Sequence, residues 1–300
     1  MTEKRNGEGK HGLAHASFLC YTLPEKRCLF VQMNLKKWTR RVESIVRKAA
    51  KITTAAYDVE EKDIPINFVT TADINVQKYL QKQLCRLIPG SAFFGEEGST
   101  GDMHGEFVWV VDPIDGTANF ARGIREFCIS VALLHNNEAV LGVVYNPAQK
   151  RMYSASKAGG AFCNGKPIHT SDVDFFKGMF CTAMSLYRKE YAPLCVKVIN
   201  EAYARCNDVR RFGACAMELC YLAEGICDLF FEFRVFPWDY AGALVILKEA
   251  GGFISGHGGE ELRFDKASMV IAANSRENFE ELEGIVRRNI ETVPYHEVFR

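Results

Sequence analysis

The sequence predicts an α/β protein of two closely joined halves, and two observations predict it. The first half places two helices ahead of a run of strands with hairpin turns, whereas the second half alternates strands with helices. The pattern changes at about residues 165–180, and no flexible linker marks the change. Because sheets and amphipathic helices bury their apolar faces by stacking in layers, we expect one layered core shared by both halves.

Helical spacing opens the patterned part of the chain. Apolar residues recur at intervals of three and four over residues 35–49, and again over 76–87, where Thr70 or Thr71 is suited to cap the helix. Pro89-Gly90 is suited to end it. Strands are expected at 92–94, 107–111, 127–134, 139–145, 151–156 and 160–168, with turns at 136–137 and 164–165.

The second half shows α/β alternation. Its expected helices are 191–204, 215–223, 240–250 and 279–290, and its expected strands are 209–212, 227–233 and 269–273. Residues 1–32 precede the first patterned helix, and they are interpreted as a disordered extension or as an overlong start with Met33 as the true initiator. Residues 33–300 are predicted to form one catalytic domain, divided into halves 33–170 and 171–300.

Composition excludes several classes of protein. The chain has 300 residues, 48% of them hydrophobic and 25% charged, and its formal net charge is +0, so charge alone attracts neither a nucleic-acid polymer nor a membrane surface. The sequence contains no run of eighteen apolar residues, so it predicts no membrane-spanning helix. The 11 cysteines are odd in number and form no CxxC pair, which favours free thiols in a reducing cytoplasm over disulfides or zinc.

Carboxylates follow the predicted strands at several points. Glu96 follows one strand, Asp112 and Asp115 follow another, Asp239 comes shortly after a third, and Asp73 opens the second helix. Acids this close to apolar strands are costly to bury unless a cation compensates them. Oxygen ligands from several elements suit Mg²⁺, Mn²⁺ or Ca²⁺ better than zinc, because no histidine or cysteine accompanies them.

The hexapeptide Asp-Pro-Ile-Asp-Gly-Thr adds a second device. Asp112 and Asp115 can both face a metal when the turn curls back, and the carbonyl of Ile114 between them is a further ligand. Gly116 lets the backbone approach a phosphate, the N–H groups of Gly116 and Thr117 can hold its oxygens, and the Thr117 hydroxyl can orient a water. Phosphate, divalent metal and water together suit phosphoester hydrolysis.

Three motifs carry a resemblance to a known family. DPIDGTANF, the upstream GEE, and WDYAGALVILKEAGG together resemble the inositol monophosphatase family of Mg²⁺-dependent, Li⁺-sensitive phosphatases, from about Met33 to about residue 290. The resemblance implies a layered αβαβα sandwich of two fused halves, as in fructose-1,6-bisphosphatase and inositol monophosphatase, and a homodimer. It also implies two or three Mg²⁺ ions per active site, with Mn²⁺ as a possible substitute.

The resemblance also implies a role for each residue that matches a family motif. Metal ligands are expected at Glu96, Asp112, Ile114 (through its carbonyl), Asp115 and Asp239. Catalytic roles in activating water are expected for Glu96, Thr117 and Asp73, and a place on a mobile metal-site loop for Lys62. Substrate contacts are expected from Asp115, Gly116, Thr117, Gly213, Ala214, Cys215, Glu232 and Asp239.

Two of these assignments have plain alternatives. Glu232 alternates with Phe231 and Phe233 on its strand, so it is also consistent with an outward-facing polar residue. Lys62 lies in a charged run, for which a solvated loop is the ordinary interpretation.

The expected reaction is hydrolysis of a phosphate monoester, with inositol 1-phosphate as the expected substrate. A related enzyme acting on 3′-phosphoadenosine nucleotides, fructose 1,6-bisphosphate, NADP or histidinol phosphate is the alternative. Ala214-Cys215 and Phe236-Pro237 depart from the common family pattern on the alcohol-binding side, which leaves the alcohol open. A non-catalytic protein that binds metal and phosphate, and a calcium-binding module, are the alternatives from other classes.

Overall fold

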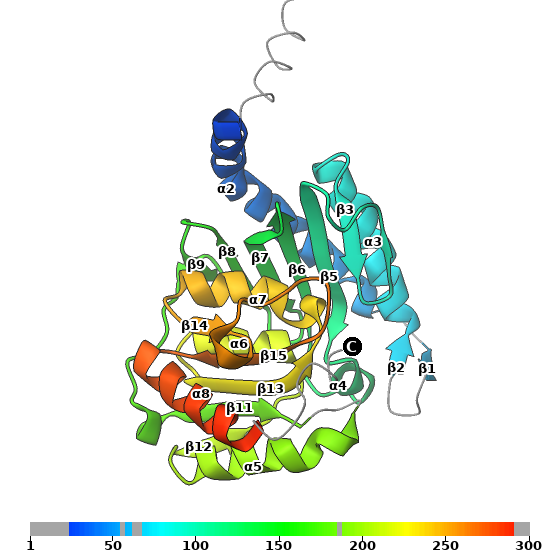
Figure 1. Cartoon of the computed structure of the whole chain (residues 1–300). Coiled ribbons are helices and arrows are strands. Elements are labelled where there is room, and N and C mark those ends of the chain that lie inside the picture. Colours follow the sequence, from blue (N-terminus) through cyan, green and yellow to red (C-terminus); the bar gives the residue numbers. More distant parts are fainter. Residues whose placement is uncertain (1–23, 55–57, 62–67, 185–187, 291–300) are drawn as a thin grey trace, which may run out of the picture.

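A computed structural model describes residues 24–54, 58–61, 68–184 and 188–290, which stack in alternating helical and sheet layers (Figure 1). An eight-stranded and a five-stranded sheet are each covered by helices on both faces. The helical layers, from one side to the other, are α2 (Pro24–Ala49) with α3 (Thr71–Leu87), then α6 (Cys215–Ala223) with α7 (Pro237–Glu249), then α5 (Ala192–Tyr203) with α8 (Arg276–Ile290). The expected αβαβα sandwich is confirmed.

The first sheet has the order β10-β9-β8-β7-β6-β5-β3-β4 and is antiparallel except where β3 runs parallel to β5. Its strands are β3 (Ala92–Gly95), β4 (Gly98–Thr100), β5 (Phe107–Asp115), β6 (Cys128–His135), β7 (Glu138–Asn146), β8 (Arg151–Ser156), β9 (Ala161–Cys163) and β10 (Lys166–Pro167). The β6–β7 hairpin turns at Asn136 and Asn137, whose φ angles of 51° and 62° suit the twist of such a turn. The short helix α4 (Thr117–Ala121) follows β5.

The second sheet has the order β12-β11-β13-β15-β14. Its strands are β11 (Met179–Ala183), β12 (Asp208–Arg210), β13 (Leu229–Val235), β14 (Phe253–Ser255) and β15 (Ser268–Ala273). A separate pair, β1 (Val59–Glu61) with β2 (Phe68–Thr70), leads into α3. Four 3₁₀ turns complete the described elements: η1 (Ile52–Thr54), η2 (Phe175–Lys177), η3 (Lys189–Tyr191) and η4 (His257–Gly259).

Side chains alternate across the sheets and so fill both neighbouring layers. On β5, Trp109 and Val111 belong to the core under α2 and α3, whereas Val108 and Val110 face the layer that contains α7. On β13, Phe231 packs with α5 and α8, while the adjacent Phe230 packs with α6 and α7. Each fully buried side chain of this size contributes about 1.5–3 kcal/mol. The α6–α7 layer is therefore shared by both sheets.

Two glycines let α7 lie directly on the first sheet. A Cβ atom on Gly142 of β7 would stand 2.0 Å from the carbonyl oxygen of Gly242 in α7, closer than any real contact. A Cβ on Gly242 would stand 2.9 Å from Ser130 Oγ on β6. Because neither position has room for a side chain, this close packing fixes where α7, and therefore Asp239 in its first turn, meets the sheet.

Several element boundaries differ from those expected. The first helix begins at Pro24, within the stretch interpreted as a disordered extension, and β5 runs to Asp115 instead of ending at Val111. The strands β1, β2, β4, β11 and β14 were not expected. Among the described residues, no helix combines the length and apolar character needed to cross a bilayer. The nine cysteines that the structure describes are free, as expected, and eight of them are buried.

Candidate metal and phosphate site

Three carboxylates, two from β5 and one from α7, meet where β5 ends and α7 begins. One oxygen each of Asp112, Asp115 and Asp239 lies within 4.8 Å of the others. A bulge in β5 makes this possible, because Asp112 stands opposite Ser130 and Asp115 opposite Cys128, so three steps on β5 match two on β6. The bulge thus lets two aspartates of one strand reach the same point.

Asp112 lies at the centre of the negative charge. Its Oδ1 accepts the N–H of Ile114 at 2.9 Å, and its side chain is buried. Burial raises the pKa of Asp112 well above its usual range, and the charges of Glu96, Asp115, Asp239 and Asp73 raise it further. A divalent cation would offset both effects, so the cluster has the chemistry of a cation site.

Glu96 reaches the cluster because β3 and β5 run in parallel. Gly95 pairs with Val111, so Glu96, which follows β3, comes beside Asp112, the next residue of β5. The N–H of Glu96 donates to the carbonyl of Val111 at 3.2 Å, and its side chain is half-buried. The structure therefore brings Glu96 into the electrostatic neighbourhood of Asp112, as the sequence led us to expect.

Asp115 and Asp239 are each held by the start of a helix. Asp115 Oδ2 accepts the N–H of Ala216 in α6 at 2.8 Å and the thiol of Cys128 at 3.6 Å. Burial raises the pKa of Asp115 to about 6 despite these hydrogen bonds. Asp239 Oδ2 accepts the N–H of Phe236 at 2.8 Å in the first turn of α7. These contacts orient both carboxylates before any ligand arrives.

Thr117 lies between two of the expected functional groups. Its Oγ1 donates to the carbonyl of Ile114 at 2.9 Å and lies 3.4 Å from Asp73 Oδ1. The other oxygen of Asp73 is committed to the cap of α3, where it accepts the N–H of Thr70 at 2.8 Å. Since a hydroxyl has one hydrogen and two lone pairs, Thr117 can donate to either acceptor and still accept from a water.

Gly116 is one of the points where the two halves touch. Its φ of 86° belongs to the left-handed region, and a Cβ there would lie 3.0 Å from the carbonyl oxygen of Glu126 and 3.1 Å from Ala214 Cβ. The carbonyl oxygen of Gly213 would be 3.2 Å away. The structure therefore places Gly213 and Ala214 directly beside the Gly116-Thr117 turn.

The remaining substrate-side residues lie nearby. Glu232, half-buried on β13, has its pKa raised well above the usual range by burial and then by Glu218, Asp239 and Asp115. Cys215, the first residue of α6, has its pKa raised by burial and by Glu232 and Asp115. Glu232 thus lies close enough to Glu218, Asp239 and Asp115 for their charges to raise its pKa. Lys62 lies outside the described residues.

A comparison with protein families decides the relationship. The model of the inositol monophosphatase family matches residues 30–291. The chain belongs to the inositol monophosphatase family. It is therefore a phosphoric monoester hydrolase, and the enzymes of this family depend on Mg²⁺.

Relatives of this inositol monophosphatase family member agree with that assignment. The chain is 35% identical over 211 residues to an inositol-1-monophosphatase of Mesorhizobium japonicum, covering 69% of this chain and 78% of that one. It is 34% identical over 197 residues to a fructose-1,6-bisphosphatase/inositol-1-monophosphatase of Aquifex aeolicus, covering 65% and 74%. The solved inositol monophosphatase of Thermotoga maritima superposes with a TM-score of 0.75 at 29% identity, covering 84% and 97%.

Two further residues of this inositol monophosphatase family member were not singled out from the sequence. Glu218, buried in α6, accepts the N–H groups of Phe212 and Gly213 at 2.7 and 2.8 Å, and burial raises its pKa to about 8. Asn119 of α4 donates through Nδ2 to the carbonyl of Phe212 at 2.7 Å. A charged residue within the apolar run CAMELCYLA was the available signal for Glu218. Asn119 had none beyond its place in the motif.

A recess of about 1220 Å³ lies away from the carboxylates. It is bordered by the β6–β7 turn, the second half of α7 and residues 254–265, and none of the expected site residues lines it. The chemistry of phosphate hydrolysis points to the acidic cluster and not to this recess.

Proposed function

We propose that this enzyme hydrolyses inositol 1-phosphate in a Mg²⁺-dependent reaction. The observation that carries the proposal is the meeting of Asp112, Asp115 and Asp239 within 4.8 Å, beside a hydroxyl and a glycine turn. Carboxylates supply cation ligands, the hydroxyl can orient a water, and the turn offers backbone N–H groups to a phosphate. This combination serves phosphate-ester hydrolysis.

The chain supplies the ligands and holds them in place. In the proposal, Glu96, Asp112, Asp115, Asp239 and the carbonyl of Ile114 hold two or three Mg²⁺ ions, or Mn²⁺ in their place. Such ions lower the pKa of a bound water and balance charge on the phosphate. The hydrogen bonds of Asp115 to α6 and of Asp239 to the start of α7 keep these carboxylates from turning away.

Thr117 and Asp73 handle the water in the proposed reaction. The Thr117 hydroxyl accepts a hydrogen bond from the attacking water, and Asp73 Oδ1, 3.4 Å from that hydroxyl, draws away the hydroxyl proton. The backbone N–H groups of Gly116 and Thr117 contact the phosphate oxygens. Gly116 carries no side chain, so the phosphate can approach the backbone closely.

The alcohol contacts the other wall of the site. Gly213, Ala214, Cys215 and Glu232 come from the second half of the chain, and the proposal assigns them contacts with the substrate hydroxyls. DPIDGTANF supports inositol 1-phosphate. The A. aeolicus relative is also named for fructose 1,6-bisphosphate, so that ester is one alternative. The others are 3′-phosphoadenosine nucleotides, NADP and histidinol phosphate, because Ala214-Cys215 and Phe236-Pro237 leave the alcohol open.

Phosphate release from a panel of substrates tests the proposal. We expect Mg²⁺-dependent turnover that is fastest with inositol 1-phosphate and inhibited by Li⁺. A clear preference for 3′-phosphoadenosine 5′-phosphate, fructose 1,6-bisphosphate, NADP or histidinol phosphate would reassign the alcohol and leave the reaction standing. Binding of Mg²⁺ and phosphate without turnover of any ester would instead support a regulatory protein. Stabilisation by Ca²⁺ alone would support a calcium-binding module.

The setting of the enzyme is part of the same proposal. The free cysteines of the described residues are consistent with a reducing compartment, and we place the enzyme in the cytoplasm as a homodimer. Light scattering at micromolar concentration would measure the mass, and the mass of one chain would exclude the dimer. The small-molecule ester is the proposed partner, and no nucleic-acid polymer is expected.

A further inference from the structure

The backbone of Phe212 and Gly213 lies beside the Gly116-Thr117 turn. Side chains form hydrogen bonds both to its N–H groups and to its carbonyl groups. Its two N–H groups donate to one oxygen of Glu218, Oε1, at 2.7 and 2.8 Å. The carbonyl of Phe212 accepts from Asn119 Nδ2 at 2.7 Å, and that of Gly213 lies 3.5 Å from the same nitrogen. Gly213 has a φ of 82°, a conformation that needs such support to be unique.

The second amide hydrogen of Asn119 forms a hydrogen bond to the first half of the chain. Its Nδ2 also donates to the carbonyl of Glu126 at 2.7 Å. That carbonyl and the carbonyl of Gly213 are two of the atoms that would crowd a Cβ on Gly116. Asn119 therefore joins, through one nitrogen, the two backbone segments that flank the proposed phosphate turn.

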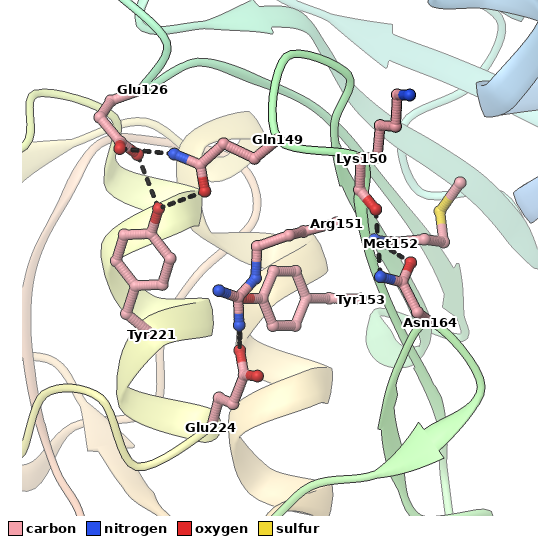
Figure 2. Close-up of polar contacts among 9 residues, drawn as sticks. All are labelled: Glu126, Gln149, Lys150, Arg151, Met152, Tyr153, Asn164, Tyr221 and Glu224. Atoms are coloured by element: carbon pink, nitrogen blue, oxygen red, sulfur yellow. Dashed lines mark hydrogen bonds and ion pairs between the residues drawn. The ribbon is translucent and has the colours of Figure 1, made fainter.

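The same network of hydrogen bonds extends from Glu126 to α6. Figure 2 shows the carboxylate of Glu126 pointing toward the hydroxyl of Tyr221 on that helix, with Gln149 bridging the two. Tyr221 donates to Glu126 Oε2 at 2.7 Å, and Gln149 Nε2 donates to Glu126 Oε1 at 2.6 Å. A path of hydrogen bonds thus runs from α6 through Glu126 and Asn119 to Phe212, and returns to α6 through Glu218.

We propose that Asn119 and Glu218 are positioning residues that hold the 212–213 peptide at a fixed distance from Gly116-Thr117 and so set the alcohol side of the site. Neither touches the reacting atoms. This inference rests on the proposed function for its assignment of the alcohol side. The hydrogen bonds from Asn119 and Glu218 to the 212–213 peptide do not depend on that assignment. A peptide released from one side would move against the phosphate turn, and misplacement by about 1 Å can cost about a hundred-fold in rate.

The substitutions follow from the atoms involved. Asn119→Ala removes both donors, and Glu218→Met keeps the volume but removes the acceptor. Glu218→Gln keeps an oxygen at Oε1 and serves as the conservative rescue. Asn274→Asp is the control, because the side-chain amide of Asn274, like that of Asn119, donates to a backbone carbonyl, that of Val173 at 2.8 Å, far from the carboxylates.

Kinetics form the first arm. With the substrate preferred in the panel, we expect Asn119→Ala and Glu218→Met to raise KM at least about ten-fold. With p-nitrophenyl phosphate, whose aryl group makes no polyol contacts, the rise should be several-fold smaller. Glu218→Gln and Asn274→Asp should stay close to the unsubstituted enzyme. Equal losses on both substrates, or a Glu218→Gln enzyme as impaired as Glu218→Met, would overturn the inference.

Hydrogen exchange forms the second arm and needs no activity. We expect the amides of the 209–217 segment to exchange at least about ten-fold faster in Asn119→Ala and Glu218→Met, and at the native rate in Asn274→Asp. Unchanged exchange in both site variants would overturn the inference. An unsubstituted protein that hydrolyses no ester would contradict the proposed function alone, since the exchange result would still decide whether these residues hold the peptide.

Discussion

Asp115 Oδ2 accepts the backbone N–H of Ala216 at 2.8 Å, so an aspartate of β5 caps the first turn of α6. The same carboxylate belongs to the acidic cluster with Asp112 and Asp239. One side chain therefore links the proposed metal side of the site to its proposed alcohol side. This hydrogen bond also connects the two halves of the chain, in addition to the α6–α7 layer that both sheets share.

Replacing Asp112 with asparagine should stabilise the metal-free protein while abolishing its response to Mg²⁺. Asparagine keeps an oxygen for the N–H of Ile114 and removes a charge that burial and four neighbouring carboxylates oppose. We expect a higher Tm in EDTA at pH 8, loss of the rise in Tm on adding Mg²⁺, and loss of turnover. Differential scanning fluorimetry and phosphate release measure these effects.

A buried aspartate elsewhere provides the control for that variant. Asp228 accepts the N–H of Met179 at 2.7 Å and lies away from the cluster. Asp228→Asn should lower Tm with and without Mg²⁺ and leave the increment between them intact. An Asp112→Asn protein that behaves like Asp228→Asn would contradict the cation site.

The stability of the metal-free protein should fall as pH rises from about 4 to about 8. Burial raises the pKa of Asp115 to about 6 and that of Glu218 to about 8, so the folded state keeps protons that the unfolded chain has already released. Each such proton lowers the free energy of unfolding by about 1.4 kcal/mol per pH unit between its two pKa values. Urea unfolding in EDTA measures the slope.

The Glu218→Gln variant separates the contribution of Glu218 to this pH dependence from that of Asp115. Glutamine keeps the acceptor for Phe212 and Gly213 but does not titrate. Its slope between pH 5 and pH 8 should be shallower than that of the unsubstituted protein by about one proton. Parallel curves for the two proteins would show that Glu218 is ionised throughout this range.

The site was predictable from sequence wherever its residues lie close together in the chain. Asp112, Ile114, Asp115, Gly116 and Thr117 form one motif, and their residue types state their chemistry. Glu218 and Asn119 form hydrogen bonds to backbone atoms of residues 212–213. Such bonds place no requirement on the side chains at positions 212 and 213. The Asn119–Phe212 bond spans 93 positions, so local pattern carried no sign of it.

The fold was predictable where periodicity is strong and less so where local rules conflict. The β5 strand was expected to end at Val111 because the apolar run stops there, at the carboxylate of Asp112. The bulge between Asp112 and Asp115 accommodates the proline, since it takes Pro113 and Ile114 out of regular pairing. Strand β11, five residues long, contains a cysteine and a threonine and precedes no hairpin, so it lacked a clear signature.

Removing the Thr117 hydroxyl should reduce kcat more than it changes KM. The hydroxyl lies 2.9 Å from the carbonyl of Ile114 and 3.4 Å from Asp73 Oδ1, where it is suited to orient water and not to bind the alcohol. We expect Thr117→Ala to lower kcat about 10²–10⁴-fold, with Thr117→Ser recovering most of it. Steady-state kinetics at saturating Mg²⁺ provide the measurement.

A buried threonine elsewhere in the fold separates catalysis from stability in that experiment. Thr182 donates to the carbonyl of Phe231 at 2.8 Å within the second sheet. Thr182→Ala should cost about 1–2 kcal/mol of stability and leave kcat unchanged. If Thr117→Ala had the same profile, the hydroxyl would be structural, and the water would need another partner.

Alanine at Gly116 should be far more harmful than alanine at Gly123, although both glycines have positive φ angles of 86° and 72°. Gly123 has no atom within 4 Å of the added Cβ, so Gly123→Ala should cost only about 1 kcal/mol of backbone strain. At Gly116 the new methyl would press on the carbonyls of Glu126 and Gly213 at 3.0 and 3.2 Å. Gly116→Ala should therefore lose about 2–3 kcal/mol of stability and at least about a hundred-fold in kcat/KM. Urea unfolding and phosphate release on both variants measure the difference, and equal behaviour would mean that the two halves do not meet at Gly116.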